Sequence, residues 1–221
     1  LHIRWPDHAL EQEARLMDYK WYAALAYIRA NKLNHNVIEG PNDRFGIMAS
    51  GKAYNDTRQA LLDLGLDDAT CRQLGIRLHK VGVVWPLEAQ LTRDFATGLQ
   101  EILVVEEKRQ VIEYQLKEEL YNWRADVRPN VVGKFSELDD GDFSGGEWSM
   151  ANPTANTLLR ANADLNPALI AKAIVQRLKK LGILDNAGAD MRARVEAQMA
   201  ILEAKGRSMD AVSYTPLTLP T

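Results

Sequence analysis

The chain has 221 residues, of which 46% are hydrophobic and 26% charged, and its formal net charge is −3. This composition is typical of a water-soluble globular domain, and the slight acidity argues against a nucleic-acid-binding protein, which usually carries a basic excess. No apolar stretch approaches the ~20 residues that a membrane helix needs. One cysteine, Cys71, excludes an internal disulfide and any iron–sulfur cluster held by this chain alone, and it fits a reducing cytoplasm. Because the chain begins with Leu1, we expect a fragment.

The first expected element is a long amphipathic helix that begins after Trp5-Pro6-Asp7 and ends near Asn34. Its apolar residues recur at steps of three and four, at Leu10, Ala14, Met17, Trp21, Leu25 and Ile28. The aromatic residues Trp21, Tyr22 and Tyr27 could form a stacking platform for a ligand. We favour a helix that docks on a domain by its aromatic face.

Strand and helix patterns then alternate from Phe45 to Phe135. Short apolar runs predict buried strands at 45–49, 78–84, 102–105 and 131–135. Helices are expected at 54–64, at 67–74, from Pro86 to Gly98 and after Arg109, the last with Glu113 and Lys117 paired on its water-facing side. This alternation predicts an α/β fold: a mostly parallel sheet in three layers, flanked by the N-terminal helix.

The remainder of the chain changes character. Residues 136–157 are acidic and rich in glycine and serine, which predicts a linker or a long surface loop. Its acidic run, 139–142, lacks the register and terminal glutamate of an EF-hand calcium loop. Two helices, one from Asn166-Pro167 to Gly182 and one over 187–205, predict a helical hairpin. Residues 213–221 match no preceding pattern, and we interpret them as a non-native tail.

Residues 46–53 spell most of a phosphate-binding P-loop. Two features argue against such a site: Ala53 replaces the Mg²⁺-binding hydroxyl, and Gly46 already belongs to a strand. A weaker hypothesis remains, in which a loop at a strand's end holds an anion with its backbone N–H groups and Lys52.

A second polar group, Glu106 to Arg109, follows a neighbouring strand. If the sheet has the strand order 2-1-3, the loops after its first and third strands face each other across the topological switch point. The candidate rim for an anion or an interface therefore comprises Ser50, Gly51, Lys52, Glu106, Glu107 and Arg109. The alternative is a solvated rim whose ion pairs set the loop geometry. No catalytic, cofactor-binding or metal-binding residue is expected, since the histidines are scattered and Cys71 has no activating base nearby.

Three segments together resemble one family: 45–61 (FGIMASGKAYNDTRQAL), 75–88 (GIRLHKVGVVWPLE) and 101–121 (EILVVEEKRQVIEYQLKEELY). They are similar to the indolepyruvate:ferredoxin oxidoreductases, which belong to the thiamine-diphosphate-dependent 2-oxoacid:ferredoxin oxidoreductases. The last two segments also resemble the transketolase C-terminal-like domain, with Pro86-Leu87-Glu88 at a helix start. Ala53 departs from the serine expected after the glycine–lysine pair.

The resemblance implies a large enzyme that decarboxylates an aryl 2-oxoacid on thiamine diphosphate with Mg²⁺, passes electrons through 4Fe-4S clusters to ferredoxin and releases an acyl-coenzyme A. This chain lacks the Gly-Asp-Gly diphosphate signature, since Gly141-Asp142 is followed by Phe143. The implied role is therefore a structural and interface domain, inactive alone, within a cytoplasmic homo-oligomer. Its partners would be the remaining domains of the same enzyme, with no nucleic-acid or membrane partner. The alternative function is a free-standing anion- or nucleotide-binding α/β regulatory module.

The expected organisation has five parts: an N-terminal helical connection (1–41), a transketolase C-terminal-like α/β domain (42–135), an acidic Gly/Ser-rich linker (136–157), a helical connection toward a missing domain (158–212) and the non-native tail (213–221).

Overall fold

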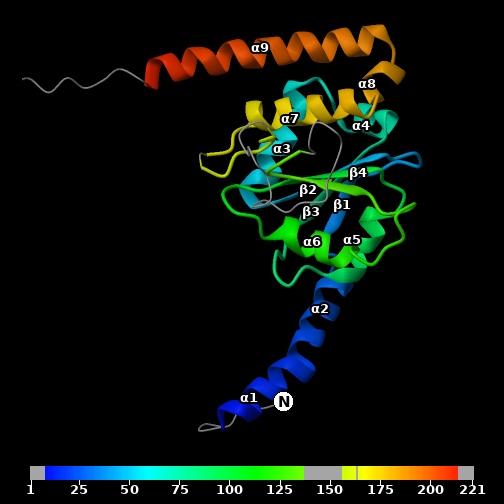
Figure 1. Ribbon diagram of the computed structural model, residues 1–221, viewed down its shortest axis with the longest axis vertical. Coiled ribbons are helices and arrows are strands. Elements are labelled where there is room, and N and C mark those ends of the chain that lie inside the picture. The colour runs from blue at the N-terminus through cyan, green and yellow to red at the C-terminus, as the bar shows by residue number, and fades with distance from the viewer. Residues whose placement is uncertain (1–7, 137–155, 163, 214–221) are drawn as a thin grey trace, which may run out of the picture.

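The computed structural model describes residues 8–136, 156–162 and 164–213 (Figure 1). Nearly all of the expected linker and residues 214–221 of the expected tail lie outside these ranges. The division into five parts stays a prediction. None of the helices in the described ranges is both long and apolar enough to cross a membrane.

A five-stranded sheet forms the centre of the molecule, in the order β1-β3-β2-β4-β5. Its strands are β1 (His35–Ile38), β2 (Phe45–Ser50), β3 (Ile76–Val81), β4 (Glu101–Val105) and β5 (Asn130–Val132). The edge strand β1 pairs with β3 antiparallel, and the other neighbours are parallel. The predicted mostly parallel sheet is confirmed.

Helices cover both faces of the sheet (Figure 1). One face carries α3 (Gly51–Asp63), α4 (Asp68–Leu74) and α7 (Pro167–Lys180), and the other carries α5 (Ala89–Ala96) and α6 (Ile112–Leu120). Strand β4 supplies both cores, because Leu103 and Val105 pack toward α7 while Ile102 and Val104 pack toward α5 and α6. Because β4 is covered on both faces, its residues from Ile102 to Val105 are all apolar, and the buried Glu101 at its start is paired with Arg177.

Several helix ends are where the local sequence predicts them. The Asp67 carboxylate accepts from the Thr70 N–H at 2.8 Å and caps α4, which ends at Gly75 with φ 77°. The Asn166 side chain caps α7 by accepting from the Leu169 N–H at 3.0 Å. These caps satisfy backbone groups that a helix end leaves without intrahelical partners.

The start of α5 was predicted wrongly. Pro86, which we expected as its first residue, lies in the preceding loop after a cis Trp85–Pro86 peptide bond. The helix begins at Ala89, because the buried Glu88 carboxylate accepts from the Leu91 N–H at 2.7 Å and so acts as the N-cap.

Two further expectations need correction. Strand β3 spans Ile76–Val81 rather than 78–84, because the Asn34 side-chain oxygen accepts from the N–H groups of Gly82 and Val83, both at 2.9 Å. Strand β1 was not expected, and it lies within the range 1–41 that we assigned to a helical connection.

The ion pair between Glu113 and Lys117 is present at 2.6 Å, but the prediction that it faces water is wrong for Glu113. The Glu113 side chain is only 4% exposed. It is covered by the chain at Gly133 and Lys134, and its Oε2 accepts from the Lys134 N–H at 3.2 Å.

The C-terminal helical hairpin is confirmed. Helix α7 is followed by the short α8 (Ile183–Asn186) and then by α9 (Ala189–Ser213), which runs back alongside α7 (Figure 1). Val195 and Met199 of α9 complete the larger core, and the buried residues of α7 pack against α3. The hairpin is therefore part of the covering of the sheet.

The N-terminal helix consists of α1 (Ala9–Arg15), the π-helical turn η1 (Leu16–Lys20) and α2 (Trp21–Ala30), and it projects from the sheet domain (Figure 1). We expected its aromatic face to be docked. That is wrong for Tyr22 and Tyr27, which are 68% and 63% exposed. Trp21 alone of the three is half-buried, and its ring meets Trp85 edge-on with centroids 5.0 Å apart.

Candidate functional site

The strand order brings the two predicted loops together. Strands β3, β2 and β4 are neighbours in that sequence, which is the expected 2-1-3 order. The register pairs Ala49 with Val105, so Ser50 and Glu106 follow at the same edge of the sheet. Because β2 leads to α3 on one face and β4 to α6 on the other, this edge is a topological switch point.

Lys52 lies in the first turn of α3 and already has two partners. Its Nζ donates to Asp56 Oδ2 at 2.6 Å and to the Leu165 carbonyl oxygen at 2.8 Å. The hydrogen bond with Asp56 and the negative charges of Asp56, Glu107 and Asp164 raise the pKa of Lys52. The lysine head therefore binds groups of the chain itself.

The segment that leads to α7 spans the rim. Leu165 accepts from Lys52 on the β2 side, and Asp164 forms an ion pair with Lys108 on the β4 side, at 3.2 Å. The side chain of Asp164 is 89% exposed. The helical hairpin thus contacts both loops of the candidate rim through this segment.

Glu106 acts as a helix cap. Its Oε1 accepts from the N–H groups of Val111 and Ile112 at 3.0 and 2.7 Å, and its Oε2 accepts from the Glu113 N–H at 3.0 Å. A carboxylate here also complements the positive end of the α6 dipole. We treated Glu106 as a rim charge, because a cap five to seven residues ahead of its donors leaves no local sequence signal.

A buried polar cluster beneath the rim was not predicted. Lys134 is 2% exposed, and its ammonium donates to the backbone carbonyl of Glu106. A Cβ at Gly133 would overlap the Glu113 carboxylate, so this position favours glycine. A lysine two residues after a short strand indicates a surface residue from sequence alone, and here the fold buries it.

The other rim residues lie at the surface or beside it. Ser50 is half-buried, and Gly51 has φ 53°, with nothing within 4 Å of an added Cβ. Glu107 is half-buried and Arg109 is exposed. Whether these residues bind an anion or another protein surface stays a prediction.

The structure agrees with the argument against a P-loop. Gly46 is the second residue of β2, and a Cβ there would come 2.5 Å from Leu99 and 2.8 Å from Phe95. This glycine serves the close packing of the sheet on the α5 side, not the wrapping of a phosphate.

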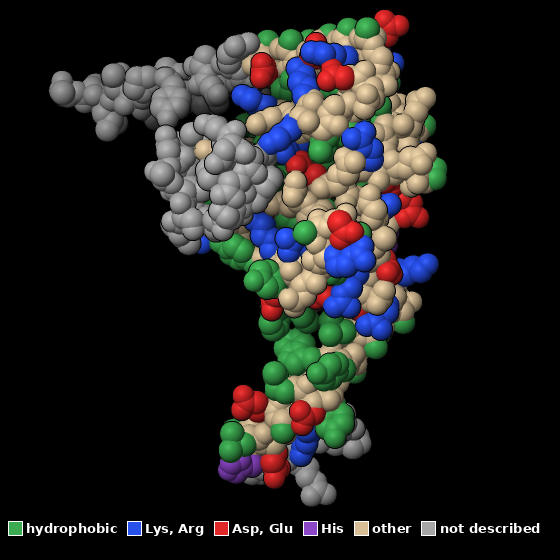
Figure 2. Space-filling view, turned by 45° about the vertical axis from the view of Figure 1, so that its right-hand side comes forward, with side chains coloured by type: hydrophobic (Ala, Val, Ile, Leu, Met, Phe, Trp, Pro, Cys, Tyr) green, Lys and Arg blue, Asp and Glu red, His purple; other side chains and the backbone are tan. Residues whose placement is uncertain are grey.

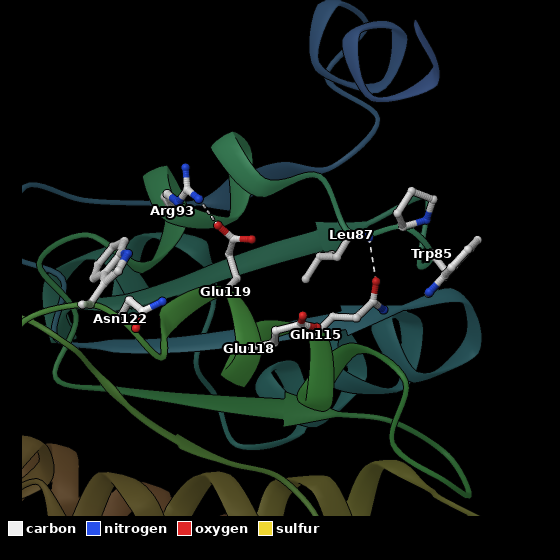
Figure 3. Close-up of a pocket in the computed structure, with 9 residues that line it drawn as sticks. Trp85, Leu87, Arg93, Gln115, Glu118, Glu119 and Asn122 are labelled. Carbon is white, nitrogen blue, oxygen red and sulfur yellow. Dashed lines mark hydrogen bonds and ion pairs between the residues drawn. The ribbon is translucent and has the colours of Figure 1, made fainter. Parts of the chain in front are cut away.

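A hollow of about 740 Å³ that we did not predict lies between the Trp85–Leu87 loop and α6 (Figure 3). Gln115 Oε1 accepts from the Leu87 N–H at 2.8 Å on one side, and Arg93 pairs with Glu119 on the other. Its lining residues are Trp85, Pro86, Leu87, Arg93, Gln115, Glu118, Glu119, Asn122 and Trp123. In the ranges the structure describes, no three His, Cys, Asp or Glu side chains gather into a possible metal site.

Fold and site together define an α/β domain in which Lys52, Glu106 and Lys108, at the carboxyl edge of the sheet, bind groups of the chain itself. Residues 34–212 match the family described as indolepyruvate ferredoxin oxidoreductase middle domain, and the chain belongs to this family. The family expected from the three sequence segments is thereby confirmed.

Relatives support the same assignment over a shorter region. The indolepyruvate oxidoreductase subunit IorA of Pyrococcus horikoshii is 37% identical over 83 residues, which cover 37% of this chain and 12% of that protein. IorA of Pyrococcus abyssi is 36% identical over 88 residues, covering 39% and 12%. IorA of Methanothermobacter marburgensis is 36% identical over 86 residues, covering 39% and 13%. The chain therefore matches a small part of the length of these relatives.

Two solved structures show a remote likeness. A split-gene transketolase, described as an inactive beta4 tetramer, has a TM-score of 0.39 at 16% identity, covering 66% of this chain and 42% of that one. The 2-oxoglutarate:ferredoxin oxidoreductase from Magnetococcus marinus has a TM-score of 0.40 at 13% identity, covering 66% and 19%. Structural similarity with TM-scores and identities this low indicates nothing about function.

Proposed function

We propose that this chain is a structural and interface domain of an indolepyruvate oxidoreductase subunit and holds no complete active site. The match of residues 34–212 to the middle-domain family carries the proposal. The rim supports it, because Lys52 and Glu106 already bind groups of the chain itself. For the same reason the alternative, a free-standing anion- or nucleotide-binding module, is not favoured.

For the full enzyme we propose oxidative decarboxylation of an aryl 2-oxoacid to an acyl-coenzyme A, with thiamine diphosphate, Mg²⁺ and 4Fe-4S clusters as cofactors and ferredoxin as electron acceptor. The only cysteine of the chain does not fit an iron–sulfur cluster. The Cys71 thiol is buried 3.6 Å from the Leu66 carbonyl oxygen, and burial raises its pKa to about 12. A cluster ligand is a thiolate, so such a thiol is unsuited to the role. We place the cofactors in other segments or partners.

The partners that we propose for this domain are the remaining domains of the same enzyme, which we take to be a homo-oligomer in the cytoplasm. The rim of Ser50, Gly51, Lys52, Glu106, Glu107 and Arg109 is the proposed contact surface. Its position supports this, because open α/β sheets make their functional contacts with ligands beside the carboxyl ends of the strands.

The direct test compares the isolated 221-residue chain with the full-length enzyme. We expect the full enzyme to reduce ferredoxin with indolepyruvate and coenzyme A. The isolated chain should stay colourless after anaerobic reconstitution and should bind no thiamine diphosphate in calorimetry. Visible iron–sulfur absorption, or micromolar binding of the diphosphate, would contradict the proposal.

The rim is tested by Lys52→Ala in the full-length enzyme. We expect lower turnover or impaired assembly, while the free energy of unfolding of the isolated chain changes little, since exposed ion pairs contribute little. Lys179→Ala is the matched control, because Lys179 forms an exposed pair with Glu196 at 2.7 Å at the far end of α7. Turnover like that of the unsubstituted enzyme in Lys52→Ala would mean that the rim is solvated surface.

A further inference from the structure

The N-terminal helix is attached to the sheet domain at its base by two contacts. Arg29 donates from Nε and Nη2 to Glu88 Oε1, at 2.9 and 2.7 Å, and the Glu88 side chain is fully buried. The ring contact between Trp21 and Trp85 is a second contact with the domain, about two helical turns before Arg29. Two anchors from separate turns set the direction of the helix, so its outer part is held away from the sheet domain (Figures 1 and 2).

The apolar stripe of this helix is covered over half of its length. Ile28 is 4% exposed, and Trp21 and Leu25 are half-buried against the domain. Farther out, Leu10 is 67% exposed and Met17 is 56% exposed. The stripe therefore continues past the edge of the domain with nothing in the described chain to cover it, and Figure 2 shows hydrophobic side chains gathered along this shaft.

Such a stripe indicates a contact surface. A helix in water gains most of its stability from packing of its apolar face, and contiguous exposed apolar patches mark interaction sites. The exposed aromatic side chain of Tyr22, at 68%, extends the patch beside the stripe. Aromatic residues of this kind are enriched in protein–protein interfaces.

The family match indicates which polypeptide covers the stripe. The match begins at residue 34, after the end of α2 at Ala30, so this helix precedes the middle domain. The matched region amounts to 12% of the Pyrococcus horikoshii relative, so a subunit of that kind contains much more polypeptide than this domain. The family's description as a middle domain implies a preceding part in proteins of this family, and we take this helix as the connection to it.

We propose that Leu10, Ala14 and Met17, together with Trp85, form a docking surface for the part of the same subunit that precedes the middle domain. This inference rests on the proposed function only in taking the chain as part of a longer oxidoreductase subunit. Trp85 also lines the hollow beside α6, where Glu118 and Glu119 lie (Figure 3). The docked surface is therefore expected to be apolar where it meets the helix.

The test is site-specific photocrosslinking in the full-length enzyme, with a benzophenone amino acid at position 17. We expect a crosslink to a peptide that precedes residue 1 within the same polypeptide. The matched control carries the probe at Ala23, which is exposed and, two residues after Trp21, faces away from the stripe. A crosslinked product of twice the subunit mass, a crosslink to another subunit, or equal yields at both positions would overturn the proposal.

A second measurement uses Met17→Asp. The isolated 221-residue chain should keep its unfolding midpoint, because this side chain is already in water, whereas the full-length subunit should lose several degrees. Equal effects in both proteins would refute docking. Ferredoxin reduction by the unsubstituted enzyme is assayed in parallel: a crosslink without turnover would retain the docking surface and reject the proposed function, and turnover without the crosslink would do the reverse.

Discussion

The ion pair between Arg177 and Glu101 joins the helical hairpin to the sheet. Arg177 Nε donates to Glu101 Oε1 at 2.6 Å and its Nη2 donates to Oε2 at 2.7 Å, with side chains 1% and 2% exposed. Removing one partner leaves the other charge buried, which costs about 3–5 kcal/mol. Since a domain is stable by only about 5–15 kcal/mol, Arg177→Met should remove a large part of the total.

The assay is urea unfolding followed by circular dichroism, for Arg177→Met, Glu101→Leu and the double variant. Replacing both charges by apolar side chains of similar volume should recover most of the loss, because such replacements are often neutral or stabilising by about 1–4 kcal/mol. The control is Arg192→Met, because Arg192 pairs with Asp185 at the same 2.6 Å but with side chains 49% and 56% exposed. A loss below about 1 kcal/mol in Arg177→Met, or additive single losses in the double variant, would refute the reasoning.

Three further predictions concern single residues. Burial lowers the pKa of His79 to about 3, so below pH 6.5 the unfolded chain takes up a proton that the folded chain does not. The free energy of unfolding should therefore fall between pH 7 and pH 5 by about 2 kcal/mol more in the unsubstituted chain than in His79→Gln. Urea titration at the two pH values measures this difference. Glu106→Ala should lower the free energy of unfolding by about 1–2 kcal/mol, because α6 loses its cap. Loss of an exposed rim charge would have only a small effect, so a change as small as that of Lys52→Ala would contradict the capping role. Cys71 should react with a maleimide only after denaturation, which mass spectrometry would show; rapid labelling of the folded chain would contradict its burial.

Local chemistry in the sequence determined much of the fold. Asp67, Gly75 and Asn166 mark helix ends because capping needs only a side chain or a left-handed residue within three positions of its partner. The apolar runs of β2 and β4 predicted strands covered on both faces, and alternating helices then predicted a parallel sheet and its switch point. The three matching segments were enough to indicate the family.

Contacts between distant segments were decided by the tertiary structure alone. Glu113 became buried because the chain returns at Gly133 and Lys134, twenty positions later, and β1 became a strand because β3 offered it an edge. Glu106 caps a helix across a loop whose path no local pattern describes. A stripe such as that of Leu10 reads the same in sequence whether it is covered by its own domain or not, because periodicity indicates an apolar face but does not name the surface that meets it.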